Sequence, residues 1–520
     1  MTAATEIELK FQVPADRASA LRRAVATAGA ARTRMQAVYA DTADGRLAAA
    51  GIALRLRQEG QRWVQTLKGR GDGLMVRLEH EVLLPTQRGR PQLDIDRHAG
   101  TPAHALLRAA LGEPPAALLP IYRTDIGRTH RVLRSGGARI ELAFDEGAIH
   151  GGGRRARVCE IEFELLSGPP QALLALAARW AQRHGLWLDV RSKAERGHRL
   201  ALDLERVPAV RAGGTALRRD MAPDAALVAM LQSALAQVLP NAAEVGDGRG
   251  SAEQVHQLRV GLRRLRCALR VYGRWAAGPE SVLAAAALEA RLRLPFTQLG
   301  GARDRDVLSA VLLPALRSAG VPDLPLSAAV ADPAAIVRDP AFSVLLLEAI
   351  ALTLPPAPTP PRSAAAGPAS WTLPVGPGTA SAAARVADAD LHRLARRRLR
   401  ALHRRALADV ADFASAPEAA QHRTRKRLKR LRYALEFSAA LFAPKAVDGL
   451  LKALRETLEV LGEYNDLLVA VALFHAALAQ EPRAALALDS LQARRGPLLE
   501  RCERSLARLA AEKPGWRSSN

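Results

Sequence analysis

The sequence predicts an α+β protein of several domains, in which an antiparallel β-barrel is followed by an all-α region. Three observations lead to this prediction. Up to about residue 200, charged and apolar residues alternate in short segments separated by turn residues, which is the period-two pattern of strands. Beyond residue 222, Ala, Leu and Arg dominate and recur with a helical period. A basic helical motif then occurs twice, which indicates a duplicated helical bundle.

The length of 520 residues suffices for two to four domains. We expect a barrel domain over 1–205, a Gly/Pro-punctuated linker over 206–222 and a helical domain over 223–512, with a disordered Pro/Ala/Gly/Ser-rich insert over 355–384. The three cysteines are far apart and form no C-x-x-C pair, which is typical of the reducing cytoplasm. We expect no signal peptide, and the longest apolar run, around 342–354, is too short to span a membrane.

The charge balance predicts an anionic partner. Lys and Arg number 75 against 52 Asp and Glu, a formal net charge of +23, which favours nucleic acid, anionic lipid or polyphosphate. Only 4% of the residues are aromatic, so base stacking has few side chains to use, and no recognition helix is evident. We therefore expect no specific nucleic acid partner and no membrane association.

The first candidate strand carries the chemistry of the barrel. In Glu6-Ile7-Glu8-Leu9-Lys10, the two carboxylates and the ammonium share one face, while the apolar residues share the other. Carboxylate oxygens suit a hard divalent cation, and the ammonium suits an anion brought by that cation. Alone, this stretch would also fit a solvated strand edge. The recurrence of the pattern downstream favours the inner wall of a barrel.

Downstream strands repeat both charged sets on period-two positions. We expect the interior of a closed barrel, open at both ends, to hold metal ions and phosphates, because unpaired buried charges of both signs are costly. Arg77, Glu79 and Glu81 fit either the tunnel lining or a solvated face. Only eight lysines occur in this Arg-rich chain, and the three before residue 400 (Lys10, Lys68 and Lys193) suggest positions that need a compact ammonium. The repeated basic positions are Arg55, Arg57, Lys68 and Arg128, and the acidic ones are Asp145, Glu160, Glu162 and Glu164.

Together, E-x-E-x-K, the paired R-x-R, the E-x-E-x-E strand and S-K-x-x-R-G resemble the CYTH family of triphosphate tunnel metalloenzymes, over roughly residues 5–205. The resemblance implies an eight-stranded tunnel that acts on triphosphates with Mg²⁺ or Mn²⁺. It implies metal ligands at Glu6, Glu8, Asp145, Glu160 and Glu162, and catalytic roles for Glu6, Glu8, Lys10 and Lys193. It implies substrate binding by Lys10, Arg55, Arg57, Lys68, Arg128 and Lys193. The loop 151–157 blurs the register, so which of Glu160, Glu162 and Glu164 bind metal stays open.

The helical region contains its basic motif twice. His256, Arg259, Arg263 and Arg266 fall on one helix face beside a leucine stripe. A shift of 166 residues reproduces this face as His422, Arg425, Lys429 and Arg432, although Arg270 becomes Glu436. A second match, at an offset of 162, relates Leu299–Asp304 to Leu461–Asp466. We expect two helical halves about a pseudo-twofold axis, with a third basic helix over 391–410.

The repeated H-x-x-R-x-x-x-R/K-x-x-R motif resembles the CHAD family over about 220–512, excluding the insert. This resemblance implies polyphosphate binding, and with it a possible place at polyphosphate granules in the cytoplasm. The two histidines are interpreted as phosphate donors or helix anchors rather than metal ligands. The residues so implicated are His256, Arg259, Arg263, Arg266, His422, Arg425, Lys429 and Arg432.

The function that this sequence favours is metal-dependent hydrolysis of inorganic triphosphate in the barrel, with polyphosphate bound by the helical domain. No Walker A motif is present, which excludes a P-loop enzyme. The alternatives are a non-catalytic polyphosphate-binding protein, a class IV-type adenylate cyclase and a thiamine triphosphatase. The sequence reveals no nucleoside pocket and gives no oligomeric state.

Overall fold

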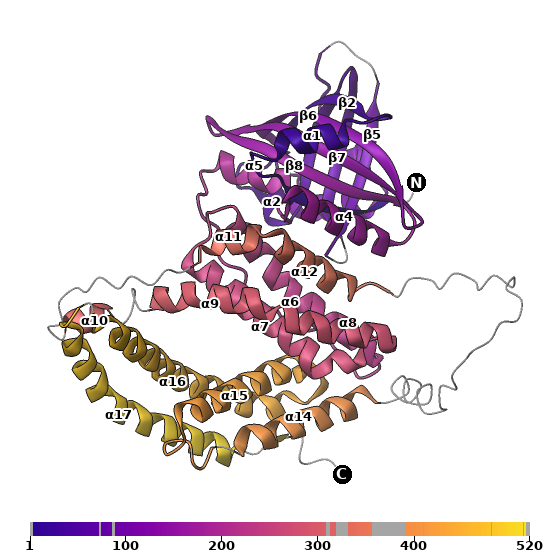
Figure 1. The fold of residues 1–520 in the computed structure, drawn as a ribbon. Helices are drawn as coiled ribbons and strands as arrows, with labels where there is room; N and C mark the ends of the chain where they lie inside the picture. Colours follow the sequence, from indigo (N-terminus) through magenta and orange to yellow (C-terminus); the bar gives the residue numbers. More distant parts are fainter. Residues whose placement is uncertain are drawn as a thin grey trace, which may run out of the picture. The chain divides into compact units, whose positions relative to one another are not determined.

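The structure is a computed structural model, which describes residues 4–71, 74–85, 89–307, 313–318, 331–355, 390–408, 410–479, 481–512, 514 and 515. The described chain forms two compact units. The first unit contains nine strands, some of which are labelled in Figure 1. Their bounds are β1 (Ala4–Gln12), β2 (Ala31–Asp41), β3 (Ala53–Glu59), β4 (Arg62–Arg70), β5 (Val76–Leu84), β6 (Leu119–Ser135), β7 (Ala138–Gly151), β8 (Arg154–Ser167) and β9 (Trp187–Leu188).

Eight of these strands close into an antiparallel barrel, as the sequence predicts. The order is β5-β4-β3-β2-β6-β7-β8-β1, and β5 pairs again with β1, so that Glu6 lies opposite Arg77. The ninth strand, β9, is a two-residue addition to β1. Closure matters for function because it gives every strand an inner face, on which alternate side chains meet.

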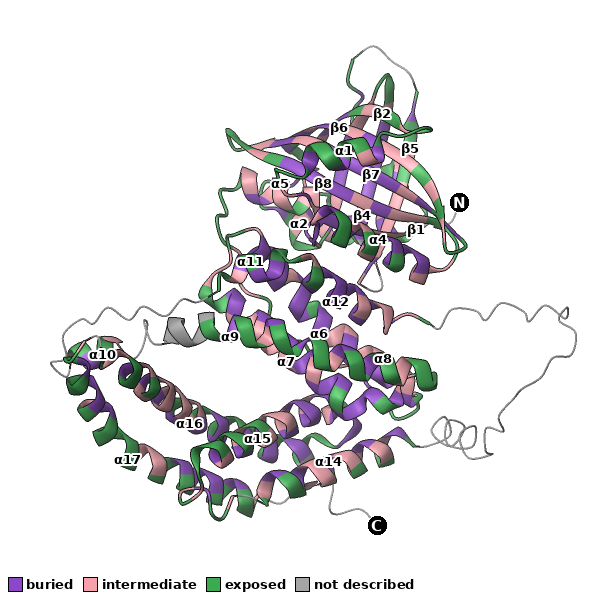
Figure 2. Cartoon of the chain, in the orientation of Figure 1, coloured by how far each residue is buried: buried purple, intermediate pink, exposed green. Residues whose placement is uncertain are grey.

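A large part of the apolar core of this unit lies outside the barrel, between the strands and the helices that cover them. Leu54 and Leu56 of β3 are 0% and 1% exposed, whereas the alternating Arg55 and Arg57 line the interior. Strand periodicity therefore separates an apolar outer face from a charged inner face. Figure 2 shows the resulting alternation of burial along the strands. The covering helices and the 3-10 turn are α1 (Ala18–Val25), α2 (Arg46–Ala49), η1 (Ile95–His98), α3 (Pro102–Leu111), α4 (Pro170–His184), α5 (Lys193–Ala201), α11 (Pro333–Arg338) and α12 (Pro340–Ala351).

Helix α5 lies across one end of the barrel, which the sequence predicts to be open at both ends. Ser192, Lys193 and Ala194 line the interior. Gly197 sits against Tyr122, where a Cβ atom would lie 2.3 Å from the ring, so this position requires glycine. Ser192 accepts a hydrogen bond from the Glu195 amide at 3.0 Å and thereby caps the helix. The cap and the close packing fix the point from which Lys193 extends.

The second unit is helical. Helix α6 contributes to both units, because its residues from 238 onward belong to the barrel unit. Residues 334–357 also belong to the barrel unit. These compact units therefore divide the chain differently from the boundaries expected from sequence; for example, Leu188 of β9 donates to Ser343 of α12 at 2.9 Å. The helices are α6 (Pro223–Gly246), α7 (Ala252–Tyr272), η2 (Gly273–Trp275), α8 (Gly278–Arg291), α9 (Arg293–Val307), α10 (Leu313–Ser318), α14 (Leu391–Leu407), α15 (Glu418–Ser438), η4 (Ala439–Leu441), α16 (Pro444–Ala477) and α17 (Ala484–Ala511).

The two halves of the helical unit share one unusual contact. A Cβ atom at Gly300 of α9 would lie 3.3 Å from Nη2 of Arg259 on α7. A Cβ atom at Gly462 of α16 would lie 3.7 Å from Nη2 of Arg425 on α15. The arginines are 166 residues apart and the glycines 162, which are the two offsets found in the sequence. In each half, the basic helix motif therefore contacts the glycine motif that the second sequence match identifies.

Two further sequence expectations concern segments around these helices. The expected insert 355–384 lies outside the described residues except for Pro355. By length and composition, α6 and residues 447–477 of α16 could each cross a membrane, but a core helix passes the same test. Within its most apolar window, 61% of α6 is buried inside the protein, as expected of a core helix.

Candidate functional site

The barrel encloses a cavity of about 380 Å³. Its described lining holds nine carboxylates and six cationic side chains. Such a lining is net negative, so an anion entering it needs positive charge from another source. The six cationic residues are the six that the sequence analysis implicates in phosphate binding, namely Lys10, Arg55, Arg57, Lys68, Arg128 and Lys193.

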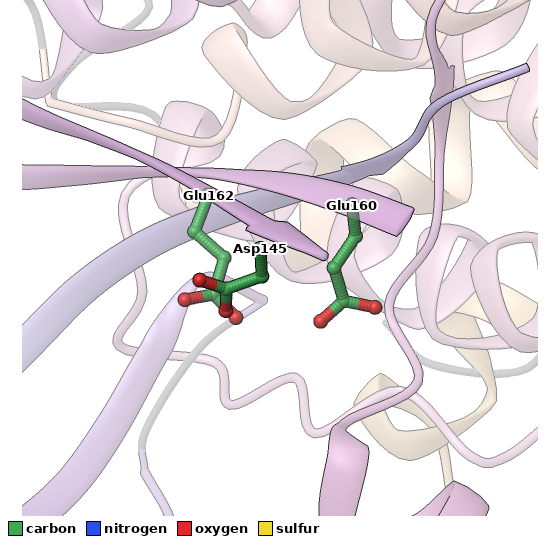
Figure 3. A group of neighbouring side chains, drawn as sticks. All are labelled: Asp145, Glu160 and Glu162. Carbon is green, nitrogen blue, oxygen red and sulfur yellow. The ribbon is translucent and has the colours of Figure 1, made fainter. Parts of the chain in front are cut away.

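Asp145, Glu160 and Glu162 form an acidic triad near the α5 end of the cavity. Asp145 on β7 lies opposite Glu160 on β8, and Glu162 follows two residues later on the same face. One oxygen from each carboxylate lies within 4.8 Å of the others, and all three groups point to the same side of the strands (Figure 3). Asp145 and Glu160 are fully buried. Three clustered carboxylates repel one another unless a cation lies between them.

The ammonium of Lys193 lies at the centre of this triad. Its Nζ atom is 2.7 Å from Asp145, 2.6 Å from Glu160 and 2.7 Å from Glu162. Burial would lower the pKa of Lys193, but the three carboxylates raise it well above its usual value. The ammonium therefore stands in for a cation in an all-oxygen site, which is the ligand chemistry of Mg²⁺ and Mn²⁺. The triad fits a divalent metal on this observation.

Two arginines hold the triad from its sides. Arg128 donates to both oxygens of Asp145 at 2.7 Å and also bonds to Glu162. Arg196 of α5 donates to Glu160 at 2.8 Å. Burial would raise the pKa of Glu160, but Lys193 and its other cationic neighbours lower it. These contacts favour the ionised form of Glu160 and hold the triad in a fixed geometry.

Glu6 and Glu8, expected as metal ligands, lie apart from the triad. Lys68 Nζ is 2.9 Å from Glu6 and 2.9 Å from Glu79, while Glu8 is 3.6 Å from Arg77. Burial raises the pKa of Glu79, with Glu6 adding to the rise and Lys68 opposing it. Carboxylates are therefore crowded at this second position as well.

Glu164 differs from its neighbours on β8. It lies opposite Glu8 and Glu141 rather than opposite a cation. Burial and the charge of Glu141 raise its pKa, whereas the pKa of Glu162 is well below its usual value because Lys193 and Arg128 outweigh its burial. The structure thus distinguishes two carboxylates that the sequence pattern leaves equivalent.

The basic wall of the cavity is itself braced. Arg55 donates to the hydroxyl of Tyr39 at 3.1 Å, and Arg57 donates to Glu81 at 2.9 Å. Lys10 is 9% exposed and lies opposite Glu162 in the strand register. Guanidinium groups fixed in this way lose little side-chain entropy when they bind an oxyanion.

In the helical unit, the predicted basic residues of the two halves converge on Lys429. The pKa of Lys429 is lowered to about 5, mainly by burial and further by the nearby charges of four arginines. These are Arg263, Arg425, Arg432 and Arg259. Arg259 and Arg263 come from α7, and the other three residues come from α15. The cluster therefore combines residues from both halves.

Other members of the predicted basic faces have partners of their own. Arg266 donates to Glu289 at 2.9 Å, and Arg432 lies 3.7 Å from Glu436. His422 makes a 3.3 Å contact with Asn465, as a helix anchor would. His256, the counterpart of His422 on α7, also has an interaction partner.

Sequence reasoning did not identify Phe296 of α9 or the role of Arg196. The guanidinium carbons of Arg259, Arg263 and Arg266 lie 5.4, 5.3 and 5.2 Å from the Phe296 ring centre. A phenylalanine among apolar helix residues gives no signal of such a contact. Arg196 belongs to the S-K-x-x-R-G motif. Its position about one helical turn after Lys193 could have suggested that both side chains contact the same carboxylate, which is Glu160.

Comparison with known proteins agrees with this division. The CYTH domain family matches residues 4–198, and the CHAD domain family matches residues 229–475. Over 168 residues, the chain is 34% identical to the inorganic triphosphatase of Haemophilus influenzae, a match that covers 31% of this chain and 44% of that protein.

Two solved structures are also similar. The CHAD domain from the plant Ricinus communis is 31% identical, with 59% of this chain and 98% of that one covered and a TM-score of 0.43. A Hippeastrum protein described as having a dominant triphosphatase activity is 21% identical, with 38% and 96% covered and a TM-score of 0.27.

Proposed function

Since the chain consists of a CYTH domain followed by a CHAD domain, we propose that its barrel hydrolyses inorganic triphosphate with a divalent metal and that its helical unit binds polyphosphate. The observation that supports the first part most is the cavity lining, with nine carboxylates against six cations. A triphosphate anion would be repelled by that lining alone. It would be accepted together with divalent cations held by the carboxylates.

In this proposal, Asp145, Glu160 and Glu162 hold the metal beside the α5 end of the cavity. Glu6 and Glu8 keep their predicted role as cation ligands on the Lys68 side. A bound metal supplies neutralisation of phosphate charge and activation of a water molecule. Which cation is preferred, Mg²⁺ or Mn²⁺, is a question for titration.

The basic side chains bind and orient the phosphates. Arg55 and Arg57 present braced forks that suit bidentate contacts to phosphate oxygens, whereas Lys10 and Lys68 supply compact point charges. Arg128 lines the cavity and also contacts Asp145 and Glu162, so it can reach a phosphate from the edge of the triad. Charge that develops on the phosphate oxygens during hydrolysis is stabilised by these fixed cations.

The second part of the proposal rests on the cluster around Lys429. Four arginines from two helices lie close enough to Lys429 for their charges to lower its pKa. Such a concentration of positive charge favours an anion with several closely spaced charges. A phosphate chain meets this requirement, and the low aromatic content gives nucleic acid bases little to stack on.

The test is a phosphate-release assay of the full chain. Inorganic triphosphate, longer polyphosphate, ATP and thiamine triphosphate are compared with Mg²⁺, with Mn²⁺ and with a chelator. We expect the fastest release from inorganic triphosphate and none with the chelator. Fastest turnover of ATP or thiamine triphosphate, or cyclic AMP among the products, would replace this substrate assignment. No release from any of them would leave only the binding function.

A further inference from the structure

A second hollow of about 930 Å³ lies on the outer side of α5, apart from the barrel cavity. It is formed within the barrel unit by the start of β8, α5 with the segments that flank it, and residues 247–250 after α6. Eight arginines and three carboxylates line it. We call it the arginine pocket.

Three of these arginines are held by carboxylates that lie behind the lining. Arg191 donates to Asp189 at 3.0 and 2.8 Å, and Arg199 donates to Glu244 at 2.6 and 2.8 Å. Arg196 is held by Glu160 of the acidic triad. These buried carboxylates fix the guanidinium planes, so an anion that binds there would pay little to order them.

The remaining arginines come from segments far apart in the sequence. Arg155 of β8 and Arg206, which follows α5, are exposed and form no ion pair among the residues that the structure describes. Their charges are therefore not balanced by a neighbouring carboxylate. Asp203 and Asp247, by contrast, pair with Arg154 and with Arg191, so two of the three lining carboxylates are already engaged.

The lining also indicates the class of ligand. Its described apolar members are an alanine, two leucines and two glycines, and no aromatic side chain is among them. Base stacking is thus unavailable, whereas several arginine forks suit phosphate oxygens. The volume exceeds what one phosphate group needs and leaves room for a chain of them.

We propose that the arginine pocket is a binding site for condensed phosphate, separate from the barrel cavity and from the helical unit. Glu160 lies between the arginine pocket and the barrel cavity. One of its oxygens accepts a hydrogen bond from Arg196 of the pocket, and the other contacts Lys193 of the cavity. The site is defined by Arg155 and Arg206, which do not touch the cavity. It goes beyond the proposed hydrolysis and does not depend on it.

The test is a calorimetric titration of the full chain with tripolyphosphate, in the presence of a chelator so that no metal-dependent turnover occurs. The Arg155→Glu/Arg206→Glu variant should lose one binding event per chain, or have one weakened at least about tenfold, because charge-assisted hydrogen bonds are lost. The Arg155→Gln/Arg206→Gln variant should show a smaller loss. The matched control is Arg123→Glu/Arg139→Glu, which changes the charge equally at exposed positions of β6 and β7.

Three results would overturn the proposal. The first is unchanged stoichiometry and affinity in both pocket variants. The second is an equal loss in the Arg123/Arg139 control, which would indicate general surface charge. The third is tighter competition by duplex DNA than by polyphosphate at the same salt. Failure of the proposed hydrolysis would be seen separately, as absent phosphate release by the unaltered chain with metal.

Discussion

The Nζ atom of Lys193 lies 2.7 Å from Oδ2 of Asp145, at the point where a cation held by the acidic triad would lie. The ammonium and a metal ion would therefore compete for the same carboxylates. The lysine offsets the repulsion within the triad. If a metal took its place, the ammonium would be free to contact a phosphate in the cavity.

The first prediction follows from this competition. Lys193→Met should bind Mn²⁺ more tightly than the unaltered chain without substrate, by roughly tenfold, because the metal no longer displaces an ion-paired ammonium. Turnover of triphosphate should nevertheless fall. Calorimetry or electron paramagnetic resonance of added Mn²⁺ measures the affinity.

Lys68→Met is the comparison for that experiment, because Lys68 contacts two carboxylates, Glu6 and Glu79, whereas Lys193 contacts three. It should raise Mn²⁺ affinity to a smaller extent. Equal Mn²⁺ affinity in Lys193→Met and the unaltered chain would show that Lys193 does not compete with the metal.

The second prediction separates two carboxylates of β8. Glu162→Gln removes an ionised member of the triad and should reduce turnover roughly a thousandfold, as expected when metal-assisted water activation is lost. Glu164→Gln should cost less than about tenfold, because Glu164 lies opposite Glu8 and Glu141 and is not a member of the triad. Steady-state rates at saturating Mg²⁺, with melting curves as a check on folding, measure both. A larger loss in Glu164→Gln would reverse this assignment.

The third prediction concerns pH and Lys429. Its pKa is about 5 in the folded protein, against 10.5 in an unfolded chain. Between these two pH values the unfolded state holds one more proton, so this residue destabilises the fold more as the pH falls from about 10.5 toward 5. Lys429→Met should therefore raise the melting temperature at pH 7, and the gain should shrink as the pH rises toward 10.

The Lys429→Met variant should at the same time bind polyphosphate less tightly. Scanning calorimetry at pH 7 and pH 10 gives the stability difference, and retention on a polyphosphate column gives the binding. A lower melting temperature at pH 7 would mean that Lys429 stabilises the cluster, contrary to the sign derived above.

The fourth prediction tests the cluster from both halves. Arg263→Glu combined with Lys429→Glu should abolish retention of the full chain on a polyphosphate column. Turnover of triphosphate in the barrel should persist. Retention of the unaltered chain should fall steeply with added salt, because each neutralised phosphate releases counterions.

A matched control for the fourth prediction is Arg393→Glu combined with Arg400→Glu on α14, which carries the same change of charge outside the Lys429 cluster. Duplex DNA should compete poorly with the polyphosphate. Undiminished retention of the cluster variant, or equal affinity for DNA, would leave only a nonspecific basic surface.

The barrel and the identity of its lining could be predicted from sequence because both depend on local alternation. Arg55 and Arg57 face inward because Leu54 and Leu56, between and beside them, are driven outward by burial. The same period-two rule places Glu160 and Glu162 on one face. Local patterns of this kind need no knowledge of which strand lies next to which.

The contacts between these residues could not be predicted, because they depend on register and docking. Lys193 meets the triad only because α5 packs across the barrel end, through Gly197 against Tyr122. The arginine pocket likewise joins Arg155 to Arg206 and to residues after α6, which no local pattern relates. Closure of β1 on β5 likewise places Glu6 beside Lys68 and Glu8 beside Arg77, and the sequence pattern does not indicate these contacts.

The repeated arginine–glycine contact allows the two halves of the helical unit to be compared residue by residue. Arg259 over Gly300 and Arg425 over Gly462 are alike in the two halves, while Phe296 in the first half corresponds to Leu458 in the second, at the same offset of 162. The half with an aromatic ring beside its arginines holds Arg263 where the other half holds Lys429. The two copies therefore differ at this position: one carries a guanidinium that stays charged, and the other carries a lysine whose burial lowers its pKa.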